Sequence, residues 1–570
     1  MTRAALAAVL VILVSAGAAA AAPAGSVGKG QAERGFLRYD KVADWLDRYP
    51  REGRSVATTW DERNRAWKVD VWWRDAGVIA TGRVGTSGEV VEAWTGPQVA
   101  WKMARGYEGA FGGKTINRLP VWLTLCAVFL LGLADLRRLL SIRNLDLLAL
   151  LSFSVSLWFF NDGDIFTSVP LAYPPLAYLL GRMVWAAARD RPAGGRPVWP
   201  VWVLAAATVF LAGFRVGLNI QASNVIDVGY SGVIGAHRLA NGEAPYGHFP
   251  VQDDRPRCGA ADREGEVRER VQTNGRCESS NERGDTYGPV AYEAYLPGYL
   301  VFGWSGRWDK LRAAHATSIL FDLLALAGLA LVGRRYGGTR LAVTLAFAWA
   351  AYPFTQYVSN SNTNDAIAPA LLVWGFWLAG SPWARGGLLA LAVWTKFFAL
   401  VLVPLWLAYG RRRIRPQLAF GTAFVLATLA AFSVLLLEPD PLHAARVFWD
   451  RTLGWQADRE SPFSLWEWGQ YRAKGIPDLH LVRRALEVLV ALGALAAYFV
   501  PRRKSPLQLA ALTAALIVGI ELVLTHWFYL YIPWFFPFVA FVVLAPRAEA
   551  PSPPALEPDD RRRELVAAAG

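Results

Sequence analysis

Apolar runs of about 20 residues recur along this 570-residue chain and constrain its fold more than any other feature. A helix of that length crosses the hydrocarbon core of a bilayer, which is roughly 30 Å thick. Hydrophobic residues make up 54% of the chain, and 26 residues are Trp. The sequence therefore predicts an all-α polytopic membrane protein.

The net charge of +13 comes with a particular distribution of arginine. Dense basic clusters fill short linkers between apolar runs: DLRRLLSIR, ARDRPAGGR, GRRYGGTR and RRRIR. Such clusters mark the cytoplasmic side of membrane proteins. We therefore expect the lipid bilayer as partner and no nucleic acid.

Hydropathy and arginine placement together predict about eleven transmembrane helices. They are 119–134, 145–160, 166–188, 199–218, 311–332, 341–358, 366–379, 417–437, 481–500, 507–524 and 529–544. This alternation places two long loops, 219–303 and 438–480, outside the cytoplasm. The Pro-rich, charged tail 546–570 is then cytoplasmic, and its composition predicts disorder.

The apolar run 386–409, GGLLALAVWTKFFALVLVPLWLAY, lies between Arg385 and RRRIR. A single crossing would place RRRIR outside, against the positive-inside bias. We therefore predict a short hairpin broken around TKFF. Because non-helical backbone at membrane depth is tolerated only where protein buries it or a cavity adjoins it, the hairpin predicts a site with Lys396 near its tip.

The first 114 residues have a different character. Residues 1–23 have the basic start, apolar core and small residues of a secretory signal, and an uncleaved anchor is the alternative. Residues 24–114 predict a small extracytoplasmic α+β domain, with a helix in QAERGFLRYDKVADWLDRYP and an antiparallel sheet from AWKVDVWWRDAG, VIATGRVG and GEVVEAWTG. This pattern resembles PepSY-type domains over about forty residues, and either a binding role or a spacer role is open. Residues 115–198 then supply additional transmembrane helices.

Two of the three cysteines, Cys258 and Cys277, share the first long loop. They would be oxidised if that loop faces outside the cell. We predict a disulfide between them, with two unrelated thiols as the alternative. Cys126 lies inside an apolar run and is interpreted as a packing residue.

Asp227 follows the predicted span 199–218 by about nine residues, at the outer membrane face. A carboxylate beside hydrocarbon is costly to keep charged, so an acidic residue there is a functional candidate. After it, Val228, Ile234 and Leu239 share one face of an amphipathic helix that suits the membrane interface. A competing acidic site is NDGD, with Asp162 and Asp164.

Asp227 begins a D-x-x-Y motif completed by Tyr230, and a helix then leads to G-x-x-P-Y, which ends at Tyr246. This order, after an outward span, resembles the GT-C superfamily of membrane glycosyltransferases. It is most similar to family 87, which uses polyprenyl-phosphate sugars and includes bacterial α-mannosyltransferases. The supporting motifs, within residues 199–545, are TYGPVAYEAYLP, YPFTQYVSNSNTND, AVWTKFFALVLVP and HWFYLYIPWFFP.

In this family the first large outer loop carries a catalytic Asp, and the resemblance assigns that role to Asp227. The chain departs from the family because three predicted spans and a soluble domain precede this loop. The resemblance implies a hexosyltransferase that moves a hexose, mannose by analogy, from a polyprenyl-phosphate carrier to an extracytoplasmic acceptor. It also implies a location in the bacterial cell membrane.

The chemistry requires few groups. One carboxylate can remove the proton of the attacking hydroxyl, and cations can stabilise the leaving phosphate. Lys396, Arg215 and His526 are candidates to bind phosphate or sugar, and Arg215 is also a candidate partner of Asp227. Snorkelling explains the two cations equally well, and an aromatic belt explains His526. Further substrate-binding candidates are Tyr230, Tyr246, Asp285, Tyr287, Glu293, Asn362, Asn364, Asp365 and Arg459.

The sequence contains no HExxH motif, no paired Cys-His spacing and no Walker A pattern. We therefore expect neither a metal nor another cofactor, since the donor sugar is already activated on its lipid phosphate. A lipid or sugar transporter, or flippase, is the alternative function. Transporters built from inverted repeats carry broken helices in matching halves, and here only one broken hairpin is found. A third possibility is a receptor whose soluble domain is a sensor.

Overall fold

The computed structural model describes residues 26–62, 64–74, 77–96, 99, 106–192, 199–249, 255–258, 269–272, 275, 277–279, 284–308, 311–410, 413–457, 461–470 and 477–546. The predicted signal segment 1–23, the tail beyond 546 and the candidate Arg459 lie outside these residues.

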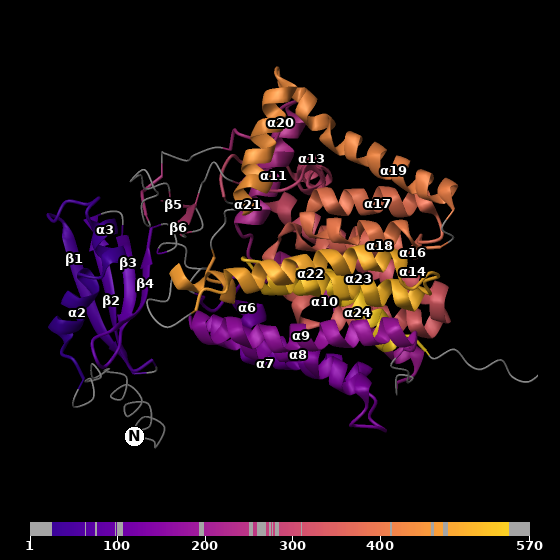
Figure 1. Cartoon of the computed structure of the whole chain (residues 1–570), viewed down its shortest axis with the longest axis horizontal. Coiled ribbons are helices and arrows are strands. Elements are labelled where there is room, and N and C mark those ends of the chain that lie inside the picture. The colour runs from indigo at the N-terminus through magenta and orange to yellow at the C-terminus, as the bar shows by residue number, and fades with distance from the viewer. Residues whose placement is uncertain are drawn as a thin grey trace, which may run out of the picture.

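Two helices and a four-stranded antiparallel sheet form the amino-terminal part (Figure 1). They are α2 (Lys29–Leu37), α3 (Asp40–Leu46), β1 (Arg54–Asp61), β2 (Ala66–Trp73), β3 (Gly77–Val84) and β4 (Val90–Thr95). The strands follow the order β1-β2-β3-β4. Phe36 and Val42 of the helices pack with Val69, Val71 and Ile79 of the sheet. The predicted antiparallel sheet is present, with β1 as a strand that the sequence motifs did not identify.

The next helices are α6 (Lys114–Asn117), α7 (Leu119–Leu133), α8 (Ile142–Asn161), α9 (Ile165–Arg189) and α10 (Val201–Ala222). A short turn joins α8 to α9, and the two helices pack along each other. The Asp164 carboxylate in that turn accepts a 3.1 Å hydrogen bond from the backbone N–H of Thr167. Asp164, one of the two competing acidic candidates, therefore caps the amino terminus of α9.

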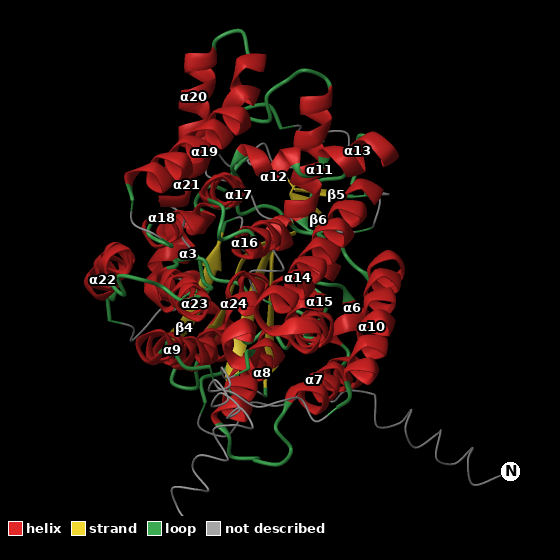
Figure 2. Cartoon of the chain, turned by 90° about the vertical axis from the view of Figure 1, so that its right-hand side faces the viewer, coloured by secondary structure: helices red, strands yellow, loops and turns green. Residues whose placement is uncertain are grey.

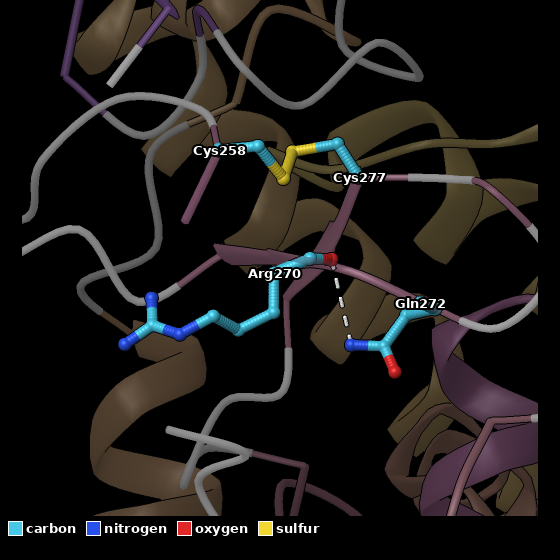
Figure 3. Close-up of a disulfide and its surroundings, with 4 residues drawn as sticks. All are labelled: Cys258, Arg270, Gln272 and Cys277. Carbon is cyan, nitrogen blue, oxygen red and sulfur yellow. Dashed lines mark hydrogen bonds between the residues drawn. A yellow bond between two sulfur atoms is a disulfide. The ribbon is translucent and has the colours of Figure 1, made fainter. Parts of the chain in front are cut away.

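The first long loop contains α11 (Asp227–Ala240), β5 (Glu269–Val271), β6 (Cys277–Ser279), α12 (Pro289–Glu293) and α13 (Leu296–Phe302). β5 and β6 pair antiparallel, and the predicted disulfide is present, joining Cys277 of β6 to Cys258 (Figure 3). Gln272 at the end of this small hairpin donates a hydrogen bond to the carbonyl oxygen of Arg270. The helices α12 and α13 pack on α11, which buries Tyr292 and Tyr295.

Helices and the loops between them form the rest of the described chain. After α14 (Arg312–Ala351) come α15 (Pro353–Ser361), η2 (Asn364–Ala366), α16 (Ile367–Trp377), α17 (Pro382–Thr395), η3 (Phe397–Leu402), α18 (Val403–Leu407), α19 (Ile414–Phe432) and η4 (Ser433–Leu437). The second long loop contains α20 (Pro441–Trp449), η5 (Asp450–Gly454), α21 (Trp455–Ala457) and η6 (Leu465–Gln470). The chain continues with α22 (His480–Phe499), α23 (Pro506–Val523), η7 (Tyr529–Tyr531) and α24 (Ile532–Leu544). Every residue of α24 is buried, because α14, α16 and α23 pack around it (Figure 2).

Five helices among the described residues are long and apolar enough to cross a membrane. They are Ile142–Asn161, Val201–Ala222, Arg312–Ala351, Ile414–Leu437 and Pro506–Val523. The chain is therefore a membrane protein, and the count of about eleven crossings stays a prediction. The predicted spans 311–332 and 341–358 both overlap α14, whose helical geometry is interrupted at Gly338 (φ 71°, ψ −168°).

The helical run 382–407 breaks at the predicted place. α17 ends at Thr395, Lys396 is extended (φ −145°, ψ 126°), and the shorter helices η3 and α18 follow. Arg385, in the first turn of α17, donates hydrogen bonds to the carbonyl oxygens of Trp406 at 2.7 Å and Tyr409 at 3.1 Å. The two ends of this segment are thus held together, with Lys396 at the turn between them.

Candidate functional site

Asp227 is the first residue of α11, and its side chain is partly exposed. The extended residues before it lie against the end of α15. The backbone N–H of Asn224 donates to the carbonyl oxygen of Asn360 at 3.0 Å, and that of Ile226 donates to Ser361 at 3.4 Å. The motif around Asp227 is thereby joined to YPFTQYVSNSNTND.

Asn362 strengthens this junction from the end of α15. Its backbone adopts the left-handed conformation (φ 53°), which Asn tolerates better than most residues. Its side-chain amide donates to the hydroxyl of Ser223 at 2.8 Å and to the carbonyl oxygen of Asn224 at 3.0 Å. Its side-chain oxygen accepts a 2.8 Å hydrogen bond from Asn219 of α10. Asn362 therefore fixes the path of the chain from α10 into Asp227.

Three residues after Asn362, the carboxylate of Asp365 accepts a 2.7 Å hydrogen bond from the ammonium group of Lys396. The Thr363 hydroxyl donates to the second carboxylate oxygen at 2.8 Å. Lys396 is only 8% exposed, so its charge is held in a buried ion pair and does not extend to solvent.

Aromatic rings surround the same ammonium group. The Lys396 nitrogen lies 5.1 Å from the ring centroid of Tyr287, 5.3 Å from that of Tyr531 and 5.4 Å from that of Trp534. These distances allow cation–π attraction. Since the rings come from the first long loop and from the segment around α24, Lys396 joins three of the motifs singled out in the sequence.

The backbone beside Tyr287 fits closely against the turn at Lys396. A Cβ atom at Gly288 would collide with the carbonyl oxygen of Trp394, so only glycine permits this approach. The hydroxyl of Tyr246 also donates a 3.0 Å hydrogen bond to the carbonyl oxygen of Tyr287. The candidate Tyr246 thus holds the backbone of Tyr287 in place.

Two carboxyl groups of the first long loop have raised pKa values. Burial raises the pKa of Asp285, although the backbone N–H of Gly247 at 2.6 Å and the guanidinium of Arg451 at 3.0 Å act in the opposite direction. Burial also raises the pKa of Glu293, in α12, to about 7. Asp285 therefore ties the two long loops together, and Glu293 titrates near neutral pH.

Arg215 does not pair with Asp227, so that expectation is wrong. Its guanidinium donates to Asp322 of α14, with a 2.9 Å bond from Nε, and to the hydroxyl of Thr355 at 3.1 Å. Trp349 donates to the same aspartate at 2.9 Å. The reason is helix packing, because α10 runs along α14 and directs Arg215 into the bundle.

His526 lies against the second long loop. Its Nδ1 is 2.7 Å from the hydroxyl of Ser461, and its ring packs against those of Phe463 and Phe528. Tyr230 stacks on Trp308 with ring centroids 4.2 Å apart, which places it in the packing of the first loop. Among the described residues, no group of three or more His, Cys, Asp and Glu side chains is arranged to hold a metal ion.

Within the described part of the chain, several buried polar atoms have no hydrogen-bond partner, including the candidate Asn364. Those near the Asp365–Lys396 region include Asn364 Oδ1, Gln356 Oε1, Asn360 Nδ2, Trp534 Nε1 and Glu521 Oε1. Because buried polar groups are nearly always bonded, these atoms are available to a ligand or to water. Sequence reasoning missed Glu521, Asp322 and Arg451. An acidic residue inside the apolar runs LIVGIELVL and LFDLLALAG was a usable signal for the first two.

Residues 287–525 match the family model of Glycosyltransferase family 87. No curated protein matches the chain. The matched segment contains Tyr287, Asn362, Asp365 and Lys396; it begins after Asp227 and ends one residue before His526. The resemblance to family 87 is confirmed, and it indicates a membrane glycosyltransferase.

Proposed function

We propose that this glycosyltransferase family 87-like membrane protein transfers a hexose from a polyprenyl-phosphate carrier to an extracytoplasmic lipid, glycan or protein acceptor. The hexose that we propose first is mannose, and the general base is Asp227. One observation carries the proposal. The side chain of Asn362, inside the family match, bonds Ser223 and Asn224, which lead directly into Asp227. Asp227 lies outside the matched residues, but the segment that leads into it is hydrogen-bonded to Asn362, which lies within them.

In this reaction an acceptor hydroxyl attacks the anomeric carbon of the donor sugar. Asp227 takes the hydroxyl proton as the new carbon–oxygen bond forms. The bond from the anomeric carbon to the phosphate oxygen breaks, and its electron pair leaves with the polyprenyl phosphate. A positioned general base contributes about 10²- to 10⁴-fold to such a step.

Lys396 is the candidate donor to the leaving phosphate. The Lys396 ammonium group donates to Asp365 and lies over the Tyr287 ring. These two contacts hold the group where it can donate to a phosphate oxygen of the donor. A preorganised donor of this kind stabilises charge that develops in the transition state. We assign His526 to orienting the sugar or phosphate from the side of the second loop.

The proposed location is the bacterial cell membrane. The disulfide between Cys258 and Cys277 supports an extracytoplasmic first loop, since disulfides persist in oxidising compartments. The amino-terminal domain and the second long loop are assigned to the same side, and the carboxyl terminus to the cytoplasm.

The test is transfer of radiolabelled mannose from synthetic polyprenyl-phosphate-mannose by purified protein. We expect Asp227→Asn to lose at least about 100-fold in turnover. Glu487→Gln, on the surface of α22, serves as a matched control and should retain full activity. Normal turnover by Asp227→Asn would refute the base assignment. If the wild type transferred no hexose from any polyprenyl-phosphate donor, the reaction itself would be wrong, and a liposome flipping assay would test the transporter alternative.

A further inference from the structure

A pocket of about 440 Å³ lies between the amino-terminal sheet and the turn that joins α8 to α9. The sheet contributes Lys68, Arg83, Glu92 and Trp94, the turn contributes Asp162, and the start of α9 contributes Phe166. The volume falls in the range of about 300–1,000 Å³ typical of small-molecule sites. The site described above does not include this pocket, and neither half of the molecule forms it alone.

We propose that this pocket binds a neutral saccharide unit of the acceptor glycan. The inference rests on the proposed transferase function, because it assigns the acceptor to a second site on the same protein. It also gives the amino-terminal domain a role, which is to complete that site.

The charges around the pocket favour a neutral ligand. Its walls include two cations, Lys68 and Arg83, and two acidic residues, Glu92 and Asp162. An anionic ligand would meet the carboxylates, and a cationic ligand would meet Lys68 and Arg83. A sugar has hydroxyl groups that both donate and accept hydrogen bonds, so it can use groups of either sign.

Two partly exposed rings of the pocket wall, Tyr107 and Phe166, suit the faces of a sugar ring. Trp94 is 3% exposed and supports Phe166 across the boundary between the two parts, with ring centroids 6.1 Å apart. Aromatic rings pack on the C–H faces of a pyranose, while its hydroxyls point outward to polar groups. The combination of a few rings and a few fixed polar groups is typical of specific small-molecule sites.

Contacts already present hold parts of the pocket wall in place. Arg83 is paired with Glu92 at 3.0 Å and with Asp61 at 3.4 Å. Gly106, at a positive φ of 67°, lies so close to Phe160 that a Cβ atom would collide with its carbonyl oxygen. Because these groups are ordered before a ligand arrives, binding costs less conformational entropy.

Aromatic contacts connect the pocket to the second long loop. Phe166 packs against Trp468 of the second long loop at 5.2 Å, and Phe160 packs against Phe463 at 6.1 Å. Phe463 in turn contacts His526 at 5.7 Å. Phe160, whose carbonyl oxygen adjoins the pocket residue Gly106, and Phe463 therefore lie between the pocket and His526.

The test measures binding of soluble saccharides to the full chain by saturation-transfer difference NMR. The probes are α-linked di- and trisaccharides of mannose, glucose and galactose, and the protein is kept in amphipol because maltoside detergents carry sugar headgroups. We expect at least one probe to bind, and Asp162→Asn and Trp94→Phe to weaken it at least tenfold. Trp72→Ala, an exposed residue of the same sheet that does not line the pocket, is the matched control.

Asp227→Asn separates this inference from the proposed function, since it should bind the probes like the wild type while losing transfer. If no probe binds, or if Asp162→Asn and Trp94→Phe bind normally, the saccharide site is wrong. If the wild-type protein binds the saccharide probes but transfers no hexose, the proposed transferase function is wrong and the saccharide site stands. In a working assay, Asp162→Asn should raise the KM for the acceptor with kcat unchanged; an unchanged KM would overturn the assignment to the acceptor.

Discussion

Lys396 donates a 2.7 Å hydrogen bond to Asp365, and the two residues are 8% and 1% exposed. The pair lies where the helical run 382–407 breaks. The extended backbone at Lys396 directs the lysine side chain toward the polar segment after α15. A buried ion pair of this kind is costly to break and much less costly to remove entirely. This difference allows its structural and catalytic roles to be separated.

We predict that Lys396→Met alone and the double variant Lys396→Met/Asp365→Asn differ in stability. Removing the lysine leaves the carboxylate buried without its partner, which should destabilise the fold by about 3–5 kcal/mol. The double variant Lys396→Met/Asp365→Asn should recover most of the lost melting temperature, yet it should still transfer no sugar if Lys396 assists the leaving phosphate. Melting in amphipol and the mannose transfer assay measure the two effects. A double variant with normal transfer would assign Lys396 to the fold alone.

The pair between Arg215 and Asp322 predicts a purely structural effect. Arg215→Met should destabilise the protein by about 3–5 kcal/mol because it leaves Asp322 unpaired inside the bundle. Arg215→Met/Asp322→Met replaces both charges with apolar side chains and should be as stable as the wild type or more so. Thermal melting checks both variants. A double variant that melts well below the wild type would contradict this arrangement.

Glu293 predicts a pH dependence of stability. Burial raises its pKa from the ordinary value of 4.5 to about 7, so the folded protein keeps the proton over a range in which the unfolded chain has lost it. The contribution of Glu293 to the free energy of unfolding is therefore fully present below pH 4.5 and decreases as the pH rises toward 7. Melting temperatures from pH 4.5 to 8 should show Glu293→Gln gaining on the wild type as the pH rises. Parallel curves would refute the shift, since Asp285 and the other titrating groups are common to both proteins.

The sequence predicted the parts of the fold that depend on local composition. Each predicted span overlaps a helix, and the break at TKFF follows from the positive-inside bias, because two basic ends on one side require the chain to turn back. The disulfide followed from two cysteines in one loop. The left-handed bend at Asn362 and the fit of Gly288 against Trp394 depend on tertiary contacts, so neither was predicted.

The partners of individual side chains were less predictable. Arg215 was a candidate partner of Asp227, whereas the structure pairs it with Asp322 of α14. Hydropathy identifies a helix but does not say which neighbour it will face. The pocket between the sheet and the α8–α9 turn was hidden for the same reason, because its two walls are far apart in the sequence and carry no shared motif.

The contact between Gly288 and Trp394 has a mechanical consequence. With no room for a methyl group between the two backbones, and with the ring of Tyr287 lying over Lys396, the first loop and the turn after α17 form one packed unit. Moving either segment away from the other would break both contacts. A path for a long lipid-linked donor that leaves both segments in place preserves this packing around Lys396.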